Sequence, residues 1–154
     1  MSLSQLIKPD GVLASLRING KKQALQEMSE RAALVSGLPA REIFDALLQR
    51  ERLGSTGVGD GVAIPHGKLA KCDQIFGVFA RLERPIDFDA PDGLPVDLIF
   101  MLVAPESAGA DHLKALAMSA RLLRNASVAT QLRATRDPTA LYALLTIAPT
   151  SNAA

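Results

Sequence analysis

The chain contains two histidines, and the residues beside each of them favour a chemical role. His66 lies between Pro65 and Gly67, so its backbone is constrained on one side and has little bulk on the other. Because imidazole titrates at about pH 6.5, a neutral ring nitrogen is available as a nucleophile. His112 follows Asp111, which we expect to be the N-cap of a helix. Two histidines without a suitably spaced third ligand predict no metal site, and we expect no cofactor.

The elements that must position these histidines follow from the spacing of apolar residues. The pattern predicts a strand at 12–18, helices at 21–36 and from Pro39 to about Leu53, strands at 75–82 and 96–103, and helices from about 111, at 128–133 and at 138–147. The strand at 96–103 is apolar at nearly every position, which is typical of a central strand covered on both faces. This order predicts an α/β fold, a single three-layer domain with a mixed β-sheet flanked by helices.

Glycines interrupt the pattern just before His66. Residues 54–61 contain four glycines, and we expect no regular element there. The short apolar piece Val62-Ala63-Ile64 then leads directly into Pro65-His66-Gly67.

Length, charge and cysteine content restrict the class of protein. The chain has 154 residues and a net charge of +1, which suits one domain and predicts no nucleic acid or anionic membrane surface as a partner. It lacks both the roughly 20-residue apolar stretch of a membrane span and the pattern of a signal peptide. The single cysteine, Cys72, fits a reducing compartment. We therefore expect a cytoplasmic protein, with one domain at 1–148 and a flexible C-terminal tail at 149–154.

The segment before and after His66 is similar to a known signature. Residues 47–68 read LLQRERLGSTGVGDGVAIPHGK. This closely resembles the active-site pattern of mannitol/fructose-type enzyme IIA domains of the bacterial phosphotransferase system, in which an apolar residue and glycine precede apolar-Ala-apolar-Pro-His-Gly. The resemblance continues through residues 95–100 and 111–113, and it covers most of residues 5–147. The Gly-Ser-Thr-Gly run and the Pro-His-Gly-Lys ending are most similar to the nitrogen-regulatory branch.

The resemblance implies roles for five residues and a set of partners. His66 matches the phosphorylated histidine, His112 the second active-site histidine, and Arg50 an arginine of the site. Ser55 and Thr56 match the loop beside the histidine and are expected to bind the phosphoryl group. A histidine phosphocarrier protein is implied as the donor, and regulatory target proteins are implied as partners. Peripheral contact with membrane transport proteins also fits the family.

The residue types suit phosphoryl transfer, which depends on in-line placement and on stabilisation of spread negative charge. The Arg50 guanidinium offers a planar fork of donors. A helix start beside His112 would favour the neutral ring, which could donate one hydrogen bond, and we expect the two imidazoles within a few ångströms of each other. We also expect a partly apolar rim for docking, with Val58 and Phe79 or Leu69 as contributors.

Simpler interpretations stay open. His112 could only cap or pack a helix, Arg50 could be a solvated charge, and the two loop hydroxyls could serve a turn. The implied function is a phosphohistidine relay more than a free-standing turnover enzyme. Two alternatives are a sugar-specific enzyme IIA that feeds a separate transporter, and a binding module in which His66 holds an anion without accepting a phosphoryl group.

Overall fold

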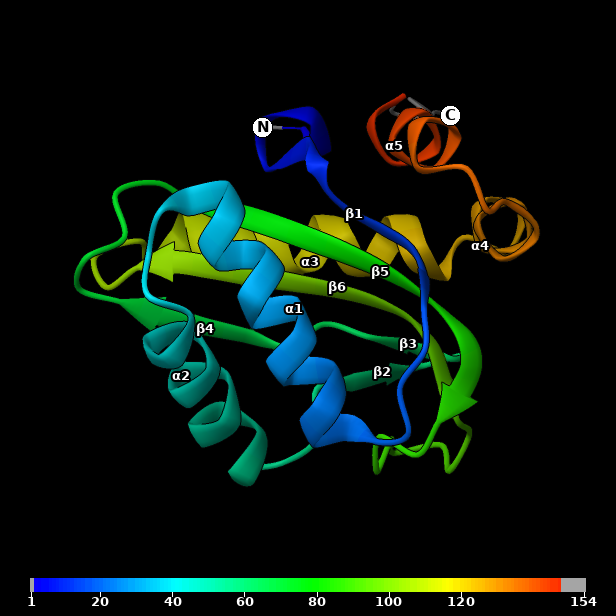
Figure 1. Cartoon of the computed structure of the whole chain (residues 1–154), viewed down its shortest axis with the longest axis horizontal. Helices are drawn as coiled ribbons and strands as arrows, with labels where there is room; N and C mark the ends of the chain where they lie inside the picture. Colours follow the sequence, from blue (N-terminus) through cyan, green and yellow to red (C-terminus); the bar gives the residue numbers. More distant parts are fainter. Residues whose placement is uncertain (1, 148–154) are drawn as a thin grey trace.

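A mixed β-sheet forms the centre of the fold (Figure 1). The computed structural model describes residues 2–147, and the predicted tail at 149–154 lies outside the described residues. The strands are β1 (Ile7–Leu16), β2 (Gly57–Gly59), β3 (Val62–Ala63), β4 (His66–Leu69), β5 (Phe76–Ile86) and β6 (Val96–Pro105). The helices are α1 (Lys21–Ser36), α2 (Ala40–Arg52), α3 (Ala110–Arg124), α4 (Ala126–Ala134) and α5 (Pro138–Thr146). No helix in the described range has the length and apolar character to cross a membrane.

Helices cover both faces of the sheet, which confirms the predicted three-layer α/β fold. α1 and α2 lie in front of the sheet in Figure 1, and α3 lies behind it. Each face has its own hydrophobic core, and the second core also includes residues of α4 and α5. Side chains of β6 alternate between the two cores: Ile99 and Met101 belong to the first, and Phe100 and Leu102 to the second. The sheet is therefore buried between two apolar layers.

β6 pairs with more strands than its neighbours and organises the sheet. The strand order is β1-β5-β6-β3-β2, and β4 also pairs with β6. β5 runs antiparallel to β6, whereas β3 and β4 run parallel to it. Residues 98–104 of β6 are buried, as predicted for an apolar strand covered on both faces.

β1 begins earlier than predicted, at Ile7 instead of residue 12. The additional segment contains Pro9 and Gly11, which argue against a central strand. β1 lies at the edge of the sheet, and its register with β5 is irregular between Ile7 and Val12. An edge strand tolerates a missing proline N–H, so tertiary pairing extends the strand through residues whose local preference opposes it.

The glycine-rich segment contains a short strand, so the expectation of no regular element there is wrong. Gly57–Gly59 forms β2 and pairs antiparallel with β3. Asp60 and Gly61 join the two strands with φ values of 59° and 79°. Two successive positive φ angles match the twist of paired strands and are typical of tight hairpins. The glycines therefore build a hairpin immediately before His66.

Gly109, and not Asp111, is the N-cap of α3. Gly109 has a φ of 50°, a left-handed backbone conformation that favours glycine. Asp111 is exposed in the first turn, where its charge complements the positive end of the helix. His112 lies in the same turn and is buried.

We expect Gly77→Ala to destabilise the fold, because β5 and β6 leave no room for a methyl group at this position. A Cβ on Gly77 would lie 2.5 Å from Cε1 of Phe100. Overpacking of a core costs about 1–3 kcal/mol, and denaturant unfolding measures this loss. Gly20→Ala is the control, because nothing lies within 4 Å of its Cβ position. Equal free energies of unfolding for the two variants would contradict the packing argument.

Candidate functional site

His66 is positioned by a strand that a proline interrupts. Val62 pairs with Leu98 and His66 pairs with Leu102, so β3 and β4 continue in one register along β6. Pro65 lies between them and has no N–H to donate to the sheet, but its carbonyl accepts from the Leu102 N–H at 2.9 Å. The pairing with β6 therefore fixes the backbone position of His66.

One hydrogen bond determines which nitrogen of His66 can react. Nδ1 of His66 lies 2.9 Å from the carbonyl oxygen of Ile64. A carbonyl can only accept, so Nδ1 carries the proton and Nε2 of the neutral ring keeps its lone pair. The Ile64 N–H donates in turn to the Thr56 carbonyl at 3.0 Å. The glycine-rich hairpin thus holds the residue that orients the His66 ring.

His112 lies beside His66, within the range expected for a shared site. The ring centroids are 5.4 Å apart, and the ring planes are inclined by 66°. His112 is only 5% exposed, and its Nδ1 has no hydrogen-bond partner among residues 2–147. Burial, aided by the charges of His66 and Lys68, lowers the pKa of His112 to about 4. The His112 ring is therefore neutral at neutral pH.

Burial also lowers the pKa of His66 below its ordinary value. The hydrogen bond to Ile64 and the negative charge of Glu51 oppose this effect, whereas the positive charges of Arg50 and Lys68 add to it. Both rings are consequently neutral at neutral pH, with one N–H each. A neutral His66 is the nucleophilic form, and a neutral His112 retains one N–H to donate.

Both histidines line one pocket of about 450 Å³ between α2, β4 and α3. Its lining residues are Ala46, Gln49, Arg50, Leu53, His66, Gly67, Lys68, His112, Leu113 and Leu116. The pocket brings Arg50, from the last turn of α2, together with the two histidines. Lys68 was not singled out from the sequence. It follows His66 by two positions on β4, and residues two apart share one side of a strand.

Two small residues let α2 approach β4 closely. A Cβ on Gly67 would lie 3.0 Å from the Cβ of Ala46 and 3.3 Å from its carbonyl carbon. A larger residue at either position would push the helix away from the strand. The close approach places Arg50, one turn beyond Ala46, at the pocket that contains His66.

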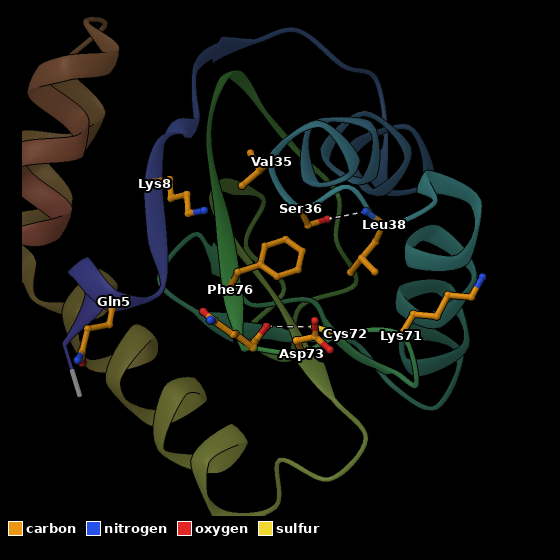
Figure 2. Close-up of a pocket in the computed structure, with 10 residues that line it drawn as sticks. Gln5, Lys8, Val35, Ser36, Leu38, Lys71, Cys72, Asp73 and Phe76 are labelled. Atoms are coloured by element: carbon orange, nitrogen blue, oxygen red, sulfur yellow. Dashed lines mark hydrogen bonds between the residues drawn. The ribbon is translucent and has the colours of Figure 1, made fainter.

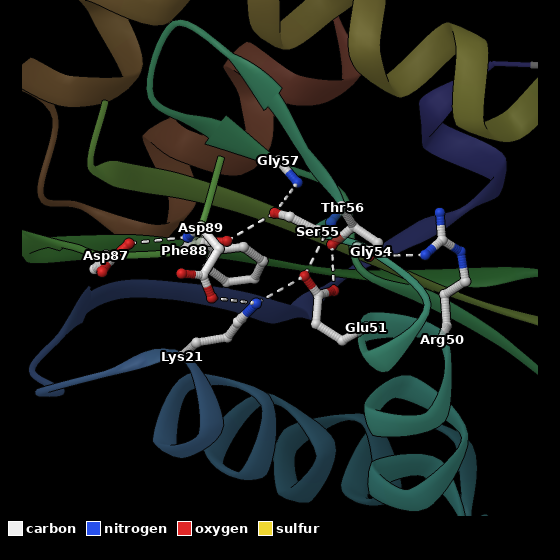
Figure 3. A network of polar contacts seen from close by, with 10 residues as sticks. All are labelled: Lys21, Arg50, Glu51, Gly54, Ser55, Thr56, Gly57, Asp87, Phe88 and Asp89. Atoms are coloured by element: carbon white, nitrogen blue, oxygen red, sulfur yellow. Dashed lines mark hydrogen bonds and ion pairs between the residues drawn. The ribbon is translucent and has the colours of Figure 1, made fainter. Parts of the chain in front are cut away.

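Within residues 2–147, one nitrogen of the Arg50 guanidinium is bound to a backbone carbonyl, and the others are not. Nη1 donates to the carbonyl of Gly54 at 2.9 Å (Figure 3). The other guanidinium N–H groups of Arg50 make no hydrogen bond within the described residues. They are available to an anion in the pocket, and the bond to Gly54 limits the directions in which the side chain can point.

The structure does not bring Ser55 and Thr56 into this pocket. Ser55 Oγ donates to the carbonyl of Phe88 at 2.7 Å. Thr56 is buried, and its Oγ1 donates to Oε1 of Glu51 at 2.6 Å. Figure 3 shows both side chains directed toward these partners. Their hydroxyls are engaged in holding the loop in this state of the protein.

The apolar rim of the pocket differs from the predicted one. Phe79 is fully buried, because β5 is an inner strand covered on both faces, so its prediction as a rim residue is wrong. Val58 and Leu69 are half-buried and pack against the two cores. The exposed apolar side chains at the pocket are Leu53, at 84% exposure, and Leu113, at 68%.

A second pocket, of about 270 Å³, has neither histidine in its lining (Figure 2). It includes Cys72, whose thiol is buried and donates to the carbonyl of Gln74 at 3.0 Å. Burial raises the pKa of the Cys72 thiol, so this group is a poor nucleophile. Within residues 2–147, no three His, Cys, Asp or Glu side chains converge as a metal site would require.

Acid should destabilise the protein through His112. Its pKa is about 4 when folded and 6.5 ordinarily, so below about pH 6.5 the unfolded chain binds a proton that the folded chain does not. Stability therefore falls as the pH drops from about 6.5 to about 4, by about 3 kcal/mol. Unfolding free energies of wild type and His112→Asn across this range measure the effect.

In His112→Asn, most of this acid-dependent loss of unfolding free energy should be absent. His66→Asn serves as the comparison, because His66 is only half-buried and its removal should flatten the curve less. A pH dependence in His112→Asn as steep as that of the wild type would show that His112 titrates normally in the folded protein.

Comparison with known proteins agrees with this geometry. Residues 5–147 match the family described as phosphoenolpyruvate-dependent sugar phosphotransferase system, EIIA 2. A nitrogen regulatory protein of Bradyrhizobium diazoefficiens is 57% identical over 153 residues, which cover 99% of this chain and 100% of that protein. A fructose-specific EIIABC component of Bacillus subtilis is 32% identical over 133 residues, which cover 86% of this chain and 21% of that protein. The crystal structure of the nitrogen regulatory protein IIA-Ntr of Neisseria meningitidis superimposes with a TM-score of 0.87 and 37% identity, covering 92% of this chain and 97% of that one. The chain therefore belongs to the EIIA type 2 family of the phosphotransferase system.

Proposed function

We propose that this chain carries a phosphoryl group on Nε2 of His66. The observation that carries the proposal is the state of the His66 ring. Its Nδ1 is committed to the Ile64 carbonyl, and its Nε2 keeps a lone pair beside a pocket that also contains Arg50 and Lys68. The Nε2 lone pair attacks phosphorus while the bond from phosphorus to the donor's histidine nitrogen breaks. The electron pair of that bond returns to the donor ring.

The surrounding side chains suit the charge that develops in this transfer. The phosphoryl oxygens carry negative charge throughout, and fixed cations and N–H donors stabilise it. Arg50 and Lys68 supply the positive charge at the pocket. His112, with a pKa of about 4, is neutral and acts as a hydrogen-bond donor instead of a third cation.

The donor is a histidine phosphocarrier protein in the cytoplasm. Such a donor must bring its own phosphohistidine to the open side of the pocket, so the two surfaces have to touch around His66. Leu53 and Leu113 are exposed there and supply apolar contact area. Short-lived complexes of this kind need only a small interface.

The phosphorylation state of His66 in turn regulates the binding of target proteins. The chain is more similar to the nitrogen regulatory protein of Bradyrhizobium diazoefficiens than to the fructose-specific EIIABC component of Bacillus subtilis. This difference supports a regulatory function. A phosphoryl group adds roughly two negative charges at the pocket, so a target can distinguish the two forms by charge. The competing functions are a sugar-specific enzyme IIA that feeds a separate transporter, and an anion-binding module that accepts no phosphoryl group.

His66→Ala should abolish phosphorylation and leave the fold intact, because the ring is half-buried in an open pocket and adds little to either core. Intact-mass spectrometry after incubation with a phosphoenolpyruvate-driven donor system measures the gain of one acid-labile phosphoryl group. Thermal unfolding checks that the variant is folded. An acid-labile gain in His66→Ala at the wild-type rate would refute the assignment, and no gain in the wild type would favour the anion-binding module.

Target binding should depend on the phosphorylation state. Pull-downs compare three samples: phosphorylated wild type, unphosphorylated wild type and His66→Ala. The phosphorylated wild type should retain different proteins from the other two samples, because it alone carries the added charge. If all three samples retain the same proteins in equal amounts, the phosphorylation state of His66 does not regulate the binding of these proteins. Phosphoryl transfer onward to a transporter component would instead support the sugar-specific alternative.

A further inference from the structure

We propose that Glu51 is a positioning residue for phosphoryl transfer at His66: its buried carboxylate holds the loop whose Gly54 carbonyl orients Arg50. This inference rests on the proposed function, and it concerns a residue that touches neither the donor nor the phosphoryl group. Glu51 is the residue after Arg50 in the last turn of α2, but it points the other way, toward the start of the glycine-rich loop (Figure 3).

The Glu51 carboxylate is buried and fully engaged. Its side chain is 3% exposed. Oε2 accepts from the Thr56 N–H at 2.9 Å and lies 3.3 Å from Nζ of Lys21, and Oε1 accepts from the Thr56 hydroxyl at 2.6 Å. A buried carboxylate is costly unless it is paired and hydrogen-bonded. These three contacts meet that requirement and leave the carboxylate one favourable position.

The loop is anchored to a second segment as well. Lys21 Nζ also lies 3.1 Å from Oδ2 of Asp89 and 5.2 Å from the centre of the Phe88 ring. Ser55 Oγ donates to the Phe88 carbonyl and accepts from the Gly57 N–H at 3.0 Å. The start of α1, the end of α2 and residues 88–89 thus hold residues 54–57 from several sides. The hydroxyls of Ser55 and Thr56 serve this anchor.

The anchor controls Arg50 through Gly54. The Gly54 N–H donates to the Glu51 carbonyl at 3.1 Å, and the Gly54 carbonyl accepts from Arg50 Nη1 at 2.9 Å. Gly54 has a φ of 150°, and a Cβ placed on it would meet open space, so no contact with the described residues restrains its backbone on that side. The bonds of Glu51 to Thr56 therefore fix the carbonyl that orients the guanidinium.

The charge of Glu51 acts on the same site. Its negative charge raises the pKa of His66, against the effects of Arg50 and Lys68. The carboxylate thus supports the geometry of the cation that binds the phosphoryl group and also offsets part of the positive field at the nucleophile.

Glu51→Gln tests the proposal because it keeps the size of the side chain and removes its charge. Single-turnover transfer to His66 should slow by roughly tenfold or more, since small displacements of a positioned group have effects of this size. Glu42→Gln is the matched control: it removes a carboxylate from the same helix, one that pairs with Lys71 at the surface, and should leave the rate unchanged.

A double-mutant cycle separates positioning from general loosening of the fold. If Glu51 acts through Arg50, adding Glu51→Gln to the Arg50→Ala variant should slow transfer by less than about twofold, because the group that Glu51 positions is already absent. The same slowing in both backgrounds, or a wild-type rate for Glu51→Gln, would overturn the proposal.

Thr56 provides a second test that leaves the carboxylate in place. Thr56→Val keeps the shape and removes the hydroxyl bond to Glu51, whereas Thr56→Ser restores that bond. We expect slow transfer in the first variant and recovery in the second. Slow transfer in both, or in neither, would contradict a role for this bond.

The NMR resonance of the Arg50 Nε–H group reports its position without any transfer. It should shift in Glu51→Gln and Thr56→Val and stay unchanged in Thr56→Ser and Glu42→Gln. If the wild type accepts no phosphoryl group, the proposed function fails, and this measurement still decides whether Glu51 orients Arg50. An unchanged resonance in Glu51→Gln would refute the inference by itself.

Discussion

The hydrogen bond from His66 Nδ1 to the Ile64 carbonyl constrains the rest of the site. It fixes both the tautomer and the orientation of the ring, so any group that acts on a bound phosphoryl must be arranged around Nε2. The bond depends on the sheet. Pro65 interrupts the strand without changing its register on β6, and the ring can then fold back onto a carbonyl two residues earlier. Because β6 is buried on both faces, a slip of one residue would exchange the two cores, and the register is strongly specified.

Three elements meet at the pocket that contains His66, and each brings one charge or donor. α2 supplies Arg50, β4 supplies Lys68 and α3 supplies His112. Burial lowers the pKa of both histidine rings, and the positive charges nearby lower it further. The same positive charges attract an anion. In the proposed transfer, His66 is therefore a neutral nucleophile beside the positive charges of Arg50 and Lys68. In the positioning role proposed for Glu51, its buried carboxylate ties the end of α2 to Thr56, and its negative charge partly offsets the effect of the two cations on His66.

The parts of this structure that sequence patterns predicted are those in which local and tertiary preferences agree. The apolar strand β6 and the alternation of strands and helices indicated a three-layer fold, and Pro65-His66-Gly67 indicated the site. The differences arise where pairing overrides composition, as at Pro9 in β1 and Gly57 in β2. The burial of Phe79 depends on helices that cover its strand from both sides. Likewise, the Phe88 carbonyl to which Ser55 Oγ donates lies far away in sequence, so no local pattern could reveal where its hydroxyl points.

The same charges that favour transfer also favour separation of the proposed complex. Before transfer, Arg50 and Lys68 face a donor that carries the phosphoryl group, so opposite charges meet across the rim formed by Leu53 and Leu113. After transfer, roughly two negative charges lie against these two cations, and the attraction toward the emptied donor is largely cancelled. Apolar contact with Leu53 and Leu113 does not depend on charge, so the difference between the two states of the proposed complex is electrostatic. A target protein that binds the same rim encounters a cationic face in one state and a nearly neutralised one in the other. The regulation proposed above therefore needs no change of fold, because the phosphoryl group itself would alter the surface that the partner contacts.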